Sequence, residues 1–355
     1  PTATLCAADG ADYSWSESVA GATRTIEING CPNHPTAKLN PNSAVKQSQK
    51  YTIPAVPNYS PSQQTSLAAV GGAVGVTYDG GMVYSAFAGP SYPLKGHSTS
   101  APYLEGNTFD QCGGHSSSNT RASYHYHVPP SCLLAQLGMT SGVHSPQIGW
   151  MADGFPLYGP LGPNGTAMKT CTVTGGKEGK DVCTDACGGY ASDTGDGYKY
   201  RYYMMGAYNS GKCSEMPAQT PGGGADYYPF SPLCLRGCCP TGAACSMGKV
   251  TLPACSSSSS GTTSKFTAGA TKAALAINSQ KSSSASYAAA TESTLCCNSA
   301  YIPSKSSSPT PSKACTTLGA CAASAACTYM TGASTSSGGG GTTGTTTAGA
   351  STSSG

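Results

Sequence analysis

The residues whose type and spacing point most directly to chemistry are two histidines on one short segment. They lie in Tyr124-His125-Tyr126-His127, where histidine alternates with tyrosine. In a β-strand, residues i and i+2 point to the same side, so we expect both imidazoles on one face and both phenols on the other. Two imidazoles placed in this way can bind one zinc or copper ion, each at about 2.0 to 2.1 Å.

A metal site needs further ligands, and other histidines could supply them. His115 is the best third candidate, because it follows Cys112-Gly113-Gly114 and glycines allow the backbone to come close to a neighbouring strand. The remaining candidates, in order, are His34 and then His97 and His144. Five of the six histidines lie between residues 97 and 144, which favours a shared site. The alternative is a polar network in which the histidines bond to carbonyls and acidic groups.

Other catalytic chemistry has little support in the sequence. No Gly-x-Ser-x-Gly elbow is present, and the segment from Thr194 to Gly197 has too few acidic residues for a calcium loop. An enzyme built on a bound metal would also need an open coordination position and a general base nearby. We therefore predict no catalytic residues, and keep a metal-dependent enzyme only as an alternative.

The segments around the histidines occur twice. Residues 74–84 align with residues 148–158 at an offset of 74, and Gly, Asp, Gly and Tyr recur in register. Residues 110–115 align with 185–190 at an offset of 75, and residues 124–128 with 198–202 at 74. In this alignment the second copy has Tyr190, Lys199 and Arg201 where the first has His115, His125 and His127. The scaffold and the histidines are thus separable, which favours one functional site over a repeated structural role.

These repeats predict a mostly β, disulfide-rich domain built from an internal pseudo-repeat, with copies at about 74–132 and 148–206. Each copy is typical of a strand, an Asp-Gly turn, a second strand, a Cys-Gly-Gly turn and an alternating strand. We expect an N-terminal extension or joining strand over residues 1–22 and the β domain over 23–255. A Ser/Thr/Ala/Gly-rich, Cys-containing tail of low complexity follows over 256–355.

The cysteines predict an exported protein. There are 18, an even number, and they lack the spacing of zinc ligands, so disulfides in an oxidising compartment are the better interpretation. Two sequons, at Asn58 and Asn164, fit N-linked glycosylation. The chain begins at Pro1 with no initiator Met, as expected of a mature chain, and contains no apolar run long enough to span a membrane.

The net charge of the chain and the composition of its tail indicate which binding partners to expect. The net charge is only +3 and the basic residues are scattered, so we expect no nucleic-acid partner. The tail cannot bury enough apolar surface to form a core, which is typical of a flexible, O-glycosylated stalk. The other interpretation is a segment that lies against neighbouring subunits of an assembly.

The sequence resembles the YHYH domain family, named for the motif at Tyr124 to His127. The resemblance extends from about Thr23 to Cys239 and leaves the tail outside. It rests on five segments, which are residues 29–35, residues 110–115, the Tyr-His-Tyr-His motif, residues 145–159 and Tyr228-Pro229-Phe230 with Cys234 and Gly237. It implies an extracellular domain and no particular reaction. This chain departs from the family pattern at Tyr198-Lys199-Tyr200-Arg201, which weakens an argument for two matched metal sites.

The preferred functional hypothesis is structural. Disulfides, sequons, low charge and the tail together predict a secreted, glycosylated subunit of an extracellular assembly such as a fibre, sheath or surface coat. Self-association into a homo-oligomer or filament would follow, through a strand or the tail docking on a sheet edge. The alternative is an extracellular module that binds one Cu or Zn ion through His125, His127, His115 and His34.

Overall fold

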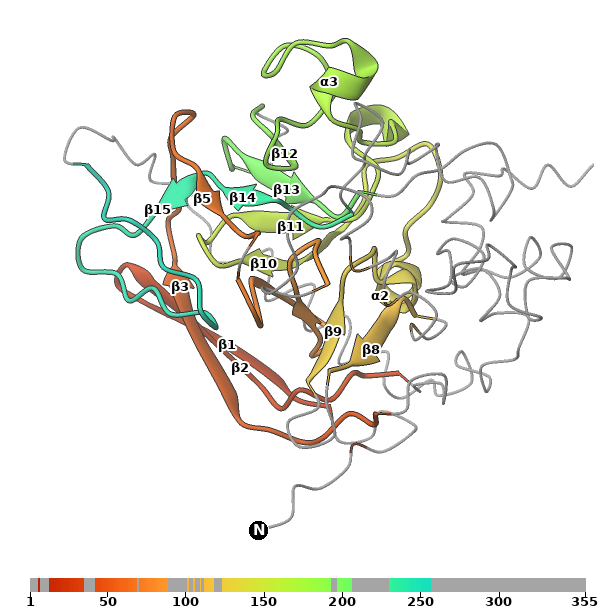
Figure 1. Ribbon diagram of the computed structural model, residues 1–355, viewed down its shortest axis with the longest axis vertical. Coiled ribbons are helices and arrows are strands. Elements are labelled where there is room, and N and C mark those ends of the chain that lie inside the picture. The colour runs from red at the N-terminus through yellow and green to blue at the C-terminus, as the bar shows by residue number, and fades with distance from the viewer. Residues whose placement is uncertain are drawn as a thin grey trace, which may run out of the picture.

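The structure, a computed structural model, describes most of the first 256 residues of the chain (Figure 1). The described residues are 13–34, 42–68, 70–88, 112–117, 123–192, 197–205 and 230–256, together with Cys6, Ala101, Glu105 and Phe109. His97 and nearly all of the predicted tail lie outside them. The described part is mostly β, as predicted, and contains no helix long and apolar enough to cross a membrane.

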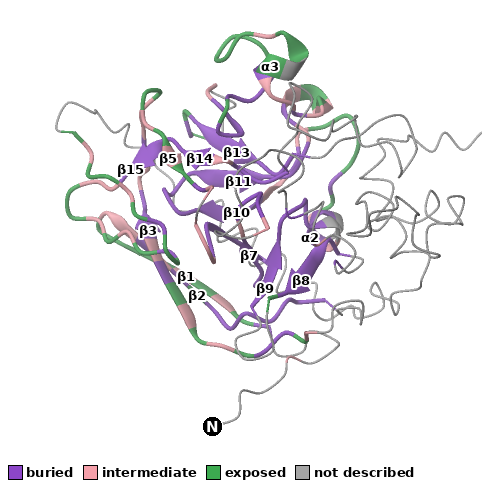
Figure 2. Cartoon of the chain, in the orientation of Figure 1, coloured by how far each residue is buried: buried purple, intermediate pink, exposed green. Residues whose placement is uncertain are grey.

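An eight-stranded sheet forms the centre of the fold. Its strands, in spatial order, are β12 (Gly189–Tyr190), β13 (Arg201–Tyr203), β11 (Pro156–Tyr158), β10 (Gln147–Met151), β6 (Gly75–Thr77), β7 (Met82–Val83), β9 (Tyr124–Tyr126) and β8 (Gly114–Ser116). The strands are short and almost entirely buried, as Figure 2 shows. Strands buried on both faces explain why the sequence between the turns is apolar or aromatic rather than amphipathic.

The strand order is the same when it is read outward from the centre in either direction. β6 and β10 pair antiparallel there, and each begins a hairpin, β6–β7 or β10–β11. The outer pairs match as well, because β7–β9 and β11–β13 are parallel whereas β8–β9 and β12–β13 are antiparallel. Two equivalent hydrogen bonds join the halves, from Tyr78 N to Ile148 O and from Ala152 N to Val74 O, both 3.0 Å.

The Asp-Gly turns of the two hairpins lie where the sequence places them. Gly80 and Gly154 have φ angles of +86° and +84°, a conformation that side chains other than glycine rarely adopt. Each preceding aspartate, Asp79 or Asp153, is buried and accepts a hydrogen bond from a tyrosine of its own half. The turns therefore link each hairpin to the aromatic strand beside it.

Strand pairing corrects the alignment of the third repeated block. Tyr126 lies opposite Val83, and Tyr202 lies opposite Leu157, the equivalent of Val83. The offset is therefore 76 rather than 74, because each connection in the second half is slightly longer. The structural equivalents of His115, His125 and His127 are Tyr190, Arg201 and Tyr203, and Lys199 is an exposed residue outside the set.

A second sheet carries the N-terminal part of the chain. It contains β1 (Trp15–Ala20), β2 (Thr23–Ile28) and β3 (Gln49–Pro54), all antiparallel (Figure 1). It packs against the central sheet, because the guanidinium of Arg24 lies 3.9 Å above the ring of Trp150 and the hydroxyl of Tyr51 contacts Met82 Sδ at 3.3 Å. The expected entry strand from Thr23 is thus β2. β1 falls within the predicted extension at residues 1–22, yet it forms a hairpin with β2, so this part of the extension belongs to the folded domain.

Small elements complete the described fold. Two short pairs join distant segments, β5 (Thr65–Ser66) with β14 (Cys234–Leu235) and β4 (Asn58–Tyr59) with β15 (Gly237–Cys238). The helical segments are α2 (Ser131–Gln136), η3 (Pro163–Gly165) and α3 (Cys171–Thr174). All are too short to form a layer of their own.

Disulfides join the described cysteines, as the even count predicts. The six bonds are Cys6–Cys31, Cys112–Cys132, Cys171–Cys183, Cys187–Cys234, Cys238–Cys255 and Cys239–Cys245. The other six cysteines lie outside the described residues. Bonds of this kind, each contributing about 2 to 4 kcal/mol, favour an extracellular compartment for a domain with such short strands.

Candidate metal centre

Strands β8 and β9 bring three of the predicted ligands together. His115 and His125 are paired across the two strands, and His127 follows β9 directly. The alternation of β9 sends the imidazoles of His125 and His127 to the same side, where their Nε2 atoms lie 3.1 Å apart. The predicted grouping of His115, His125 and His127 is therefore what the structure contains.

Backbone carbonyls determine which ring nitrogens carry protons. His125 Nδ1 lies 2.9 Å from Ser123 O, and His127 Nδ1 lies 2.7 Å from Ser85 O. A carbonyl oxygen only accepts hydrogen bonds, so both Nδ1 atoms are the N–H donors. In the neutral rings both Nε2 atoms then present lone pairs, and these lone pairs face each other.

Either a proton or a metal ion could lie between the two facing lone pairs, and the burial of the rings disfavours the proton. His125 and His127 are 2% and 3% exposed. Desolvation, helped by the neighbouring imidazoles, holds the pKa of His125 well below its usual value, and desolvation lowers the pKa of His127 to about 4. At neutral pH both rings are uncharged, which is the state in which imidazole binds a metal ion.

Glu105 supplies an acidic donor that the spacing of the histidines does not predict. Its Oε2 lies 3.5 Å from His115 Nε2 and 3.8 Å from His127 Nε2. One donor atom each from Glu105, His115, His125 and His127 lie within 4.8 Å of one another. One feature of the sequence does point to Glu105: it is the only glutamate between Glu27 and Glu178, and it lies within the histidine-rich stretch.

Aromatic rings surround the imidazoles. Tyr84 stacks on His125 with ring centroids 3.8 Å apart and an interplanar angle of 17°. Phe109 lies parallel to His127 at 5.9 Å and edge-on to His115 at 4.7 Å. The side chain of Glu105 is 23% exposed and that of His115 only 7%, so the carboxylate is on the side of the cluster nearer to solvent. Glu105 is thus the most exposed of the four donor groups.

His34 is not part of this cluster, which corrects its assignment as a ligand of the same ion. It lies on the opposite side of β9, where its Nε2 is 2.9 Å from Tyr126 Oη and its ring is edge-on to Tyr124. Tyr126 in turn donates to Asp79 Oδ2 at 2.5 Å. The alternation that groups the two histidines of β9 also places its tyrosines, and with them His34, on the other face.

The equivalent place in the second half holds a permanent cation. Arg201, which occupies the position of His125, is fully buried. Its Nη1 donates to Ser192 O at 2.8 Å and its Nη2 to Tyr198 O at 2.6 Å. The lesser candidate His144 belongs to this half, where its Nε2 lies 2.8 Å from Tyr203 Oη.

The two sequons differ in accessibility. Asn58 is 7% exposed and lies in β4 opposite Cys238, a position that leaves little room for a glycan. Asn164 is exposed and has a φ of +58° in η3. Of the two predicted glycosylation sites, only Asn164 has the exposure that a glycan needs.

The fold and the site together define a disulfide-bonded β domain with a buried histidine cluster. Comparison with protein families identifies it, because the family model described as YHYH protein matches residues 50–207. This part of the chain is a YHYH domain, with the motif from Tyr124 to His127 inside it. No curated protein and no solved structure matches the chain. The match is narrower than the segment from Thr23 to Cys239 that the resemblance suggested, and it spans the whole eight-stranded sheet.

Proposed function

We propose that this YHYH domain is an extracellular metal-binding module, and that Glu105, His115, His125 and His127 bind one zinc or copper ion. The observation that carries the proposal is the 3.1 Å separation of the Nε2 atoms of His125 and His127. Two ligands that each bind one ion at about 2.05 Å with a tetrahedral angle are about 3.3 Å apart. A cation between the two atoms turns the opposed lone pairs into a favourable arrangement.

The hydrogen bonds of the site support binding of a metal over a purely polar network. Metal-bound histidines commonly donate their other ring N–H to a carbonyl, which fixes the tautomer and orients the ring. His125 and His127 both have this arrangement. In a polar network without an ion, one of the two facing Nε2 atoms would have to carry a proton. A neutral imidazole has only one N–H, so the Nδ1 of that ring would lose its hydrogen bond to the carbonyl.

The donor set favours binding over catalysis. Three imidazoles and one carboxylate are enough to complete a tetrahedral zinc shell, and a shell completed by protein leaves no open position for a substrate. Nitrogen and oxygen donors suit Zn²⁺ and Cu²⁺ better than the oxygen-preferring Mg²⁺ or Ca²⁺. The proposed role is therefore to hold an ion.

Removal of one central ligand tests the proposal. We expect wild-type protein to bind one Zn²⁺ or Cu²⁺ per chain by calorimetry, and His125→Ala to bind it on the order of 100-fold more weakly or not at all. His144→Ala is the control, because His144 lies in the other half and its loss leaves the cluster intact. Elemental analysis of protein purified without chelator gives a second reading, and less than about a tenth of an ion per chain together with no calorimetric binding would contradict the proposal.

The assembly hypothesis stays a separate prediction. Its main support is the Ser/Thr-rich tail, and residues 257–355 lie outside the described part of the chain. Export and glycosylation at Asn164 are proposals that are consistent with the disulfides and with the exposure of Asn164. None of them depends on the metal.

A further inference from the structure

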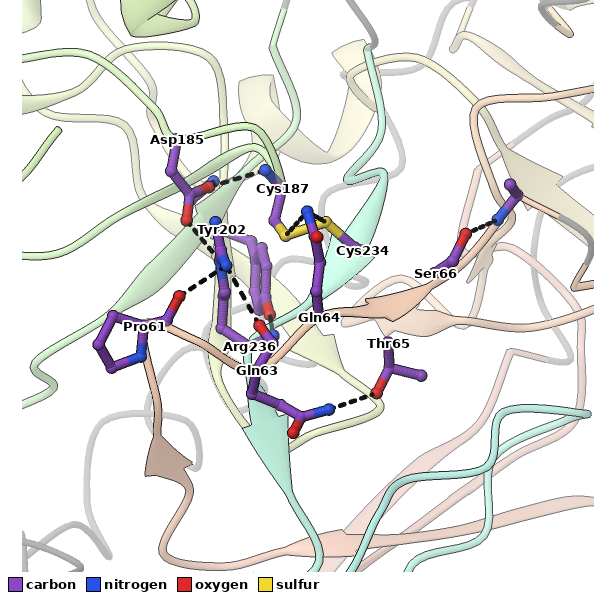
Figure 3. Close-up of a disulfide and its surroundings, with 12 residues drawn as sticks. Pro61, Gln63, Gln64, Thr65, Ser66, Asp185, Cys187, Tyr202, Cys234 and Arg236 are labelled. Carbon is purple, nitrogen blue, oxygen red and sulfur yellow. Dashed lines mark hydrogen bonds and ion pairs between the residues drawn. A yellow bond between two sulfur atoms is a disulfide. The ribbon is translucent and has the colours of Figure 1, made fainter. Parts of the chain in front are cut away.

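Both halves of the central sheet anchor their Cys-Gly-Gly turn with a disulfide, but the partners differ. In the first half, Cys112 bonds to Cys132, only 20 residues away. In the second half, the equivalent Cys187 bonds to Cys234, 47 residues away on β14. Figure 3 shows this second bond beside Gln64 and the ion pair of Asp185 with Arg236. Of these two described disulfides, only Cys112–Cys132 joins its Cys-Gly-Gly turn to a cysteine in the same half of the sheet.

The loop closed by Cys112–Cys132 contains all three imidazole ligands. His115 lies three residues after Cys112, and His127 lies five residues before Cys132. β8 is the edge strand of the central sheet and pairs only with β9, whereas β9 lies between β7 and β8. His125 is therefore held by strands on both sides, and His127 follows β9 directly, whereas His115 lies on the edge strand close to the disulfide.

One end of the disulfide lies nearer to solvent than the other. Cys112 is fully buried, but Cys132 in α2 is partly exposed. A dithiol reductant can attack Cys132 Sγ, with Cys112 leaving as a thiolate that takes up a proton. The second thiol of the reductant then releases Cys132, so the reductant becomes a disulfide and the chain gains two thiols.

We propose that this disulfide controls the metal site: the oxidised form holds the ion tightly, and reduction by a dithiol frees β8 and releases the ion. This inference rests on the proposed function of the site. By thermodynamic linkage the effect is reciprocal, so the bound ion makes Cys112–Cys132 harder to reduce by the same factor. A tenfold coupling corresponds to about 30 mV for this two-electron couple.

The test compares two disulfide-deficient variants of the full chain. We expect Cys112→Ala/Cys132→Ala to bind Zn²⁺ at least about tenfold more weakly than the oxidised wild type. Cys171→Ala/Cys183→Ala is the matched control, because it removes another short-range disulfide, 12 residues apart, from the other half. Its affinity should equal that of the wild type, and circular dichroism of each variant checks the fold.

A second measurement needs no variant. Wild-type protein is equilibrated with dithiothreitol at graded ratios, with and without Zn²⁺, and the free thiols are alkylated and assigned by mass spectrometry. Zinc should shift the reduction midpoint of Cys112–Cys132 and leave that of Cys171–Cys183 unchanged, after correction for zinc bound by the reductant. Equal midpoints with and without zinc, in protein that binds zinc, would overturn the proposal.

The opposite sign of linkage would overturn it too. Donor atoms of His34, Cys112 and Cys132 lie within 4.8 Å of one another, so the freed thiols have an imidazole beside them. If zinc makes the disulfide easier to reduce, the reduced thiols bind the ion and the proposed control is wrong. Failure of the oxidised wild type to bind any metal is a different result, which contradicts the proposed function itself.

Discussion

Neighbouring residues of one short strand have opposite chemical roles in this domain. His125 faces the imidazole cluster, whereas Tyr126 faces a fully buried set in which its hydroxyl contacts Asp79 and His34. The residue types alone do not decide these roles. The side of β9 to which each side chain points decides them. A substitution on the tyrosine side can therefore show whether that side affects metal binding on the histidine side.

Tyr126→Phe tests this separation. The change removes the hydroxyl that donates to the buried carboxylate of Asp79, so we expect the free energy of unfolding to fall by about 1 to 3 kcal/mol. Zinc affinity should stay within about threefold of the wild type, because the imidazoles face the other side. Urea unfolding and zinc calorimetry measure the two effects.

Tyr202→Phe is the matched control for Tyr126→Phe, since Tyr202 makes the equivalent bond to Asp153 at 2.7 Å. It should cost a similar amount of stability and leave zinc binding unchanged. A large loss of zinc affinity in Tyr126→Phe alone would show that the two faces of β9 are coupled.

The burial of Asp153 makes the stability of the domain depend on pH. Desolvation raises the pKa of this buried carboxyl to about 6, from an ordinary value of 3.8. A raised pKa means that the folded form binds the proton more tightly, so this contribution to stability is complete below about pH 4 and is lost as the pH rises through 6. The difference corresponds to about 3 kcal/mol.

Asp153→Asn should therefore remove one component of the pH profile. Between pH 4 and 7, we expect the stability of the wild type relative to the variant to fall by about 3 kcal/mol as the pH rises. Urea unfolding at several pH values measures this difference. Parallel profiles for the two proteins would mean that Asp153 has an ordinary pKa in the folded state.

At the scale of elements, the antiparallel pair β6–β10 joins the two halves of the sheet. Gly149 of β10 lies opposite Thr77 of β6. A Cβ atom at position 149 would lie 1.9 Å from the carbonyl oxygen of Val76, far inside van der Waals contact. The close approach of the two strands thus requires glycine at this position.

Gly149→Ala should accordingly damage the centre of the sheet. The added methyl group must push apart backbone that cannot rotate away, so we expect a loss of about 3 kcal/mol or more, or failure to fold. Ser18→Ala on the exposed part of β1 is the control and should change stability by less than about 0.5 kcal/mol. Thermal and urea unfolding compare the two, and similar stabilities would contradict the close packing of β6 on β10.

Local patterns in the sequence predicted the hairpins and the grouping of three histidines, but not the order of strands. Asp79-Gly80 and Asp153-Gly154 specify turns, and alternation in Tyr124 to His127 specifies faces. The parallel pairing of β7 with β9 depends on long connections that carry no periodic signal, and the same connections changed the offset from 74 to 76. Glu105 and His34 could not be placed, because their contacts cross such connections.

At the scale of the whole molecule, the disulfides concern the stability of the β domain, whereas the tail concerns its assembly. The six described disulfides all lie within residues 6–255 and stabilise the β domain. The predicted assembly depends on the tail beyond them or on an exposed edge strand. The two hypotheses, a metal module and a subunit of a fibre or coat, are therefore compatible and can be tested independently.

Mass photometry and negative-stain microscopy of the native, full-length protein test the assembly. If the tail or an edge strand such as β1 joins subunits, we expect oligomers or filaments whose size increases with concentration. Added chelator should not dissociate them, because the metal cluster is built from β8, β9 and Glu105 and includes no residue of β1 or of the tail. A monodisperse monomer at high concentration would contradict the structural hypothesis.

The buried guanidinium of Arg201 has a consequence for how the domain responds when its ion is lost. In the second half of the sheet the buried positive charge belongs to a side chain, so a chelator cannot remove it, whereas the proposed ion of the first half can be removed. Losing the ion would then loosen β8 and β9 while β12 and β13 keep their protection from amide hydrogen exchange. Metal depletion should appear as local opening of one half of a folded protein and not as cooperative unfolding.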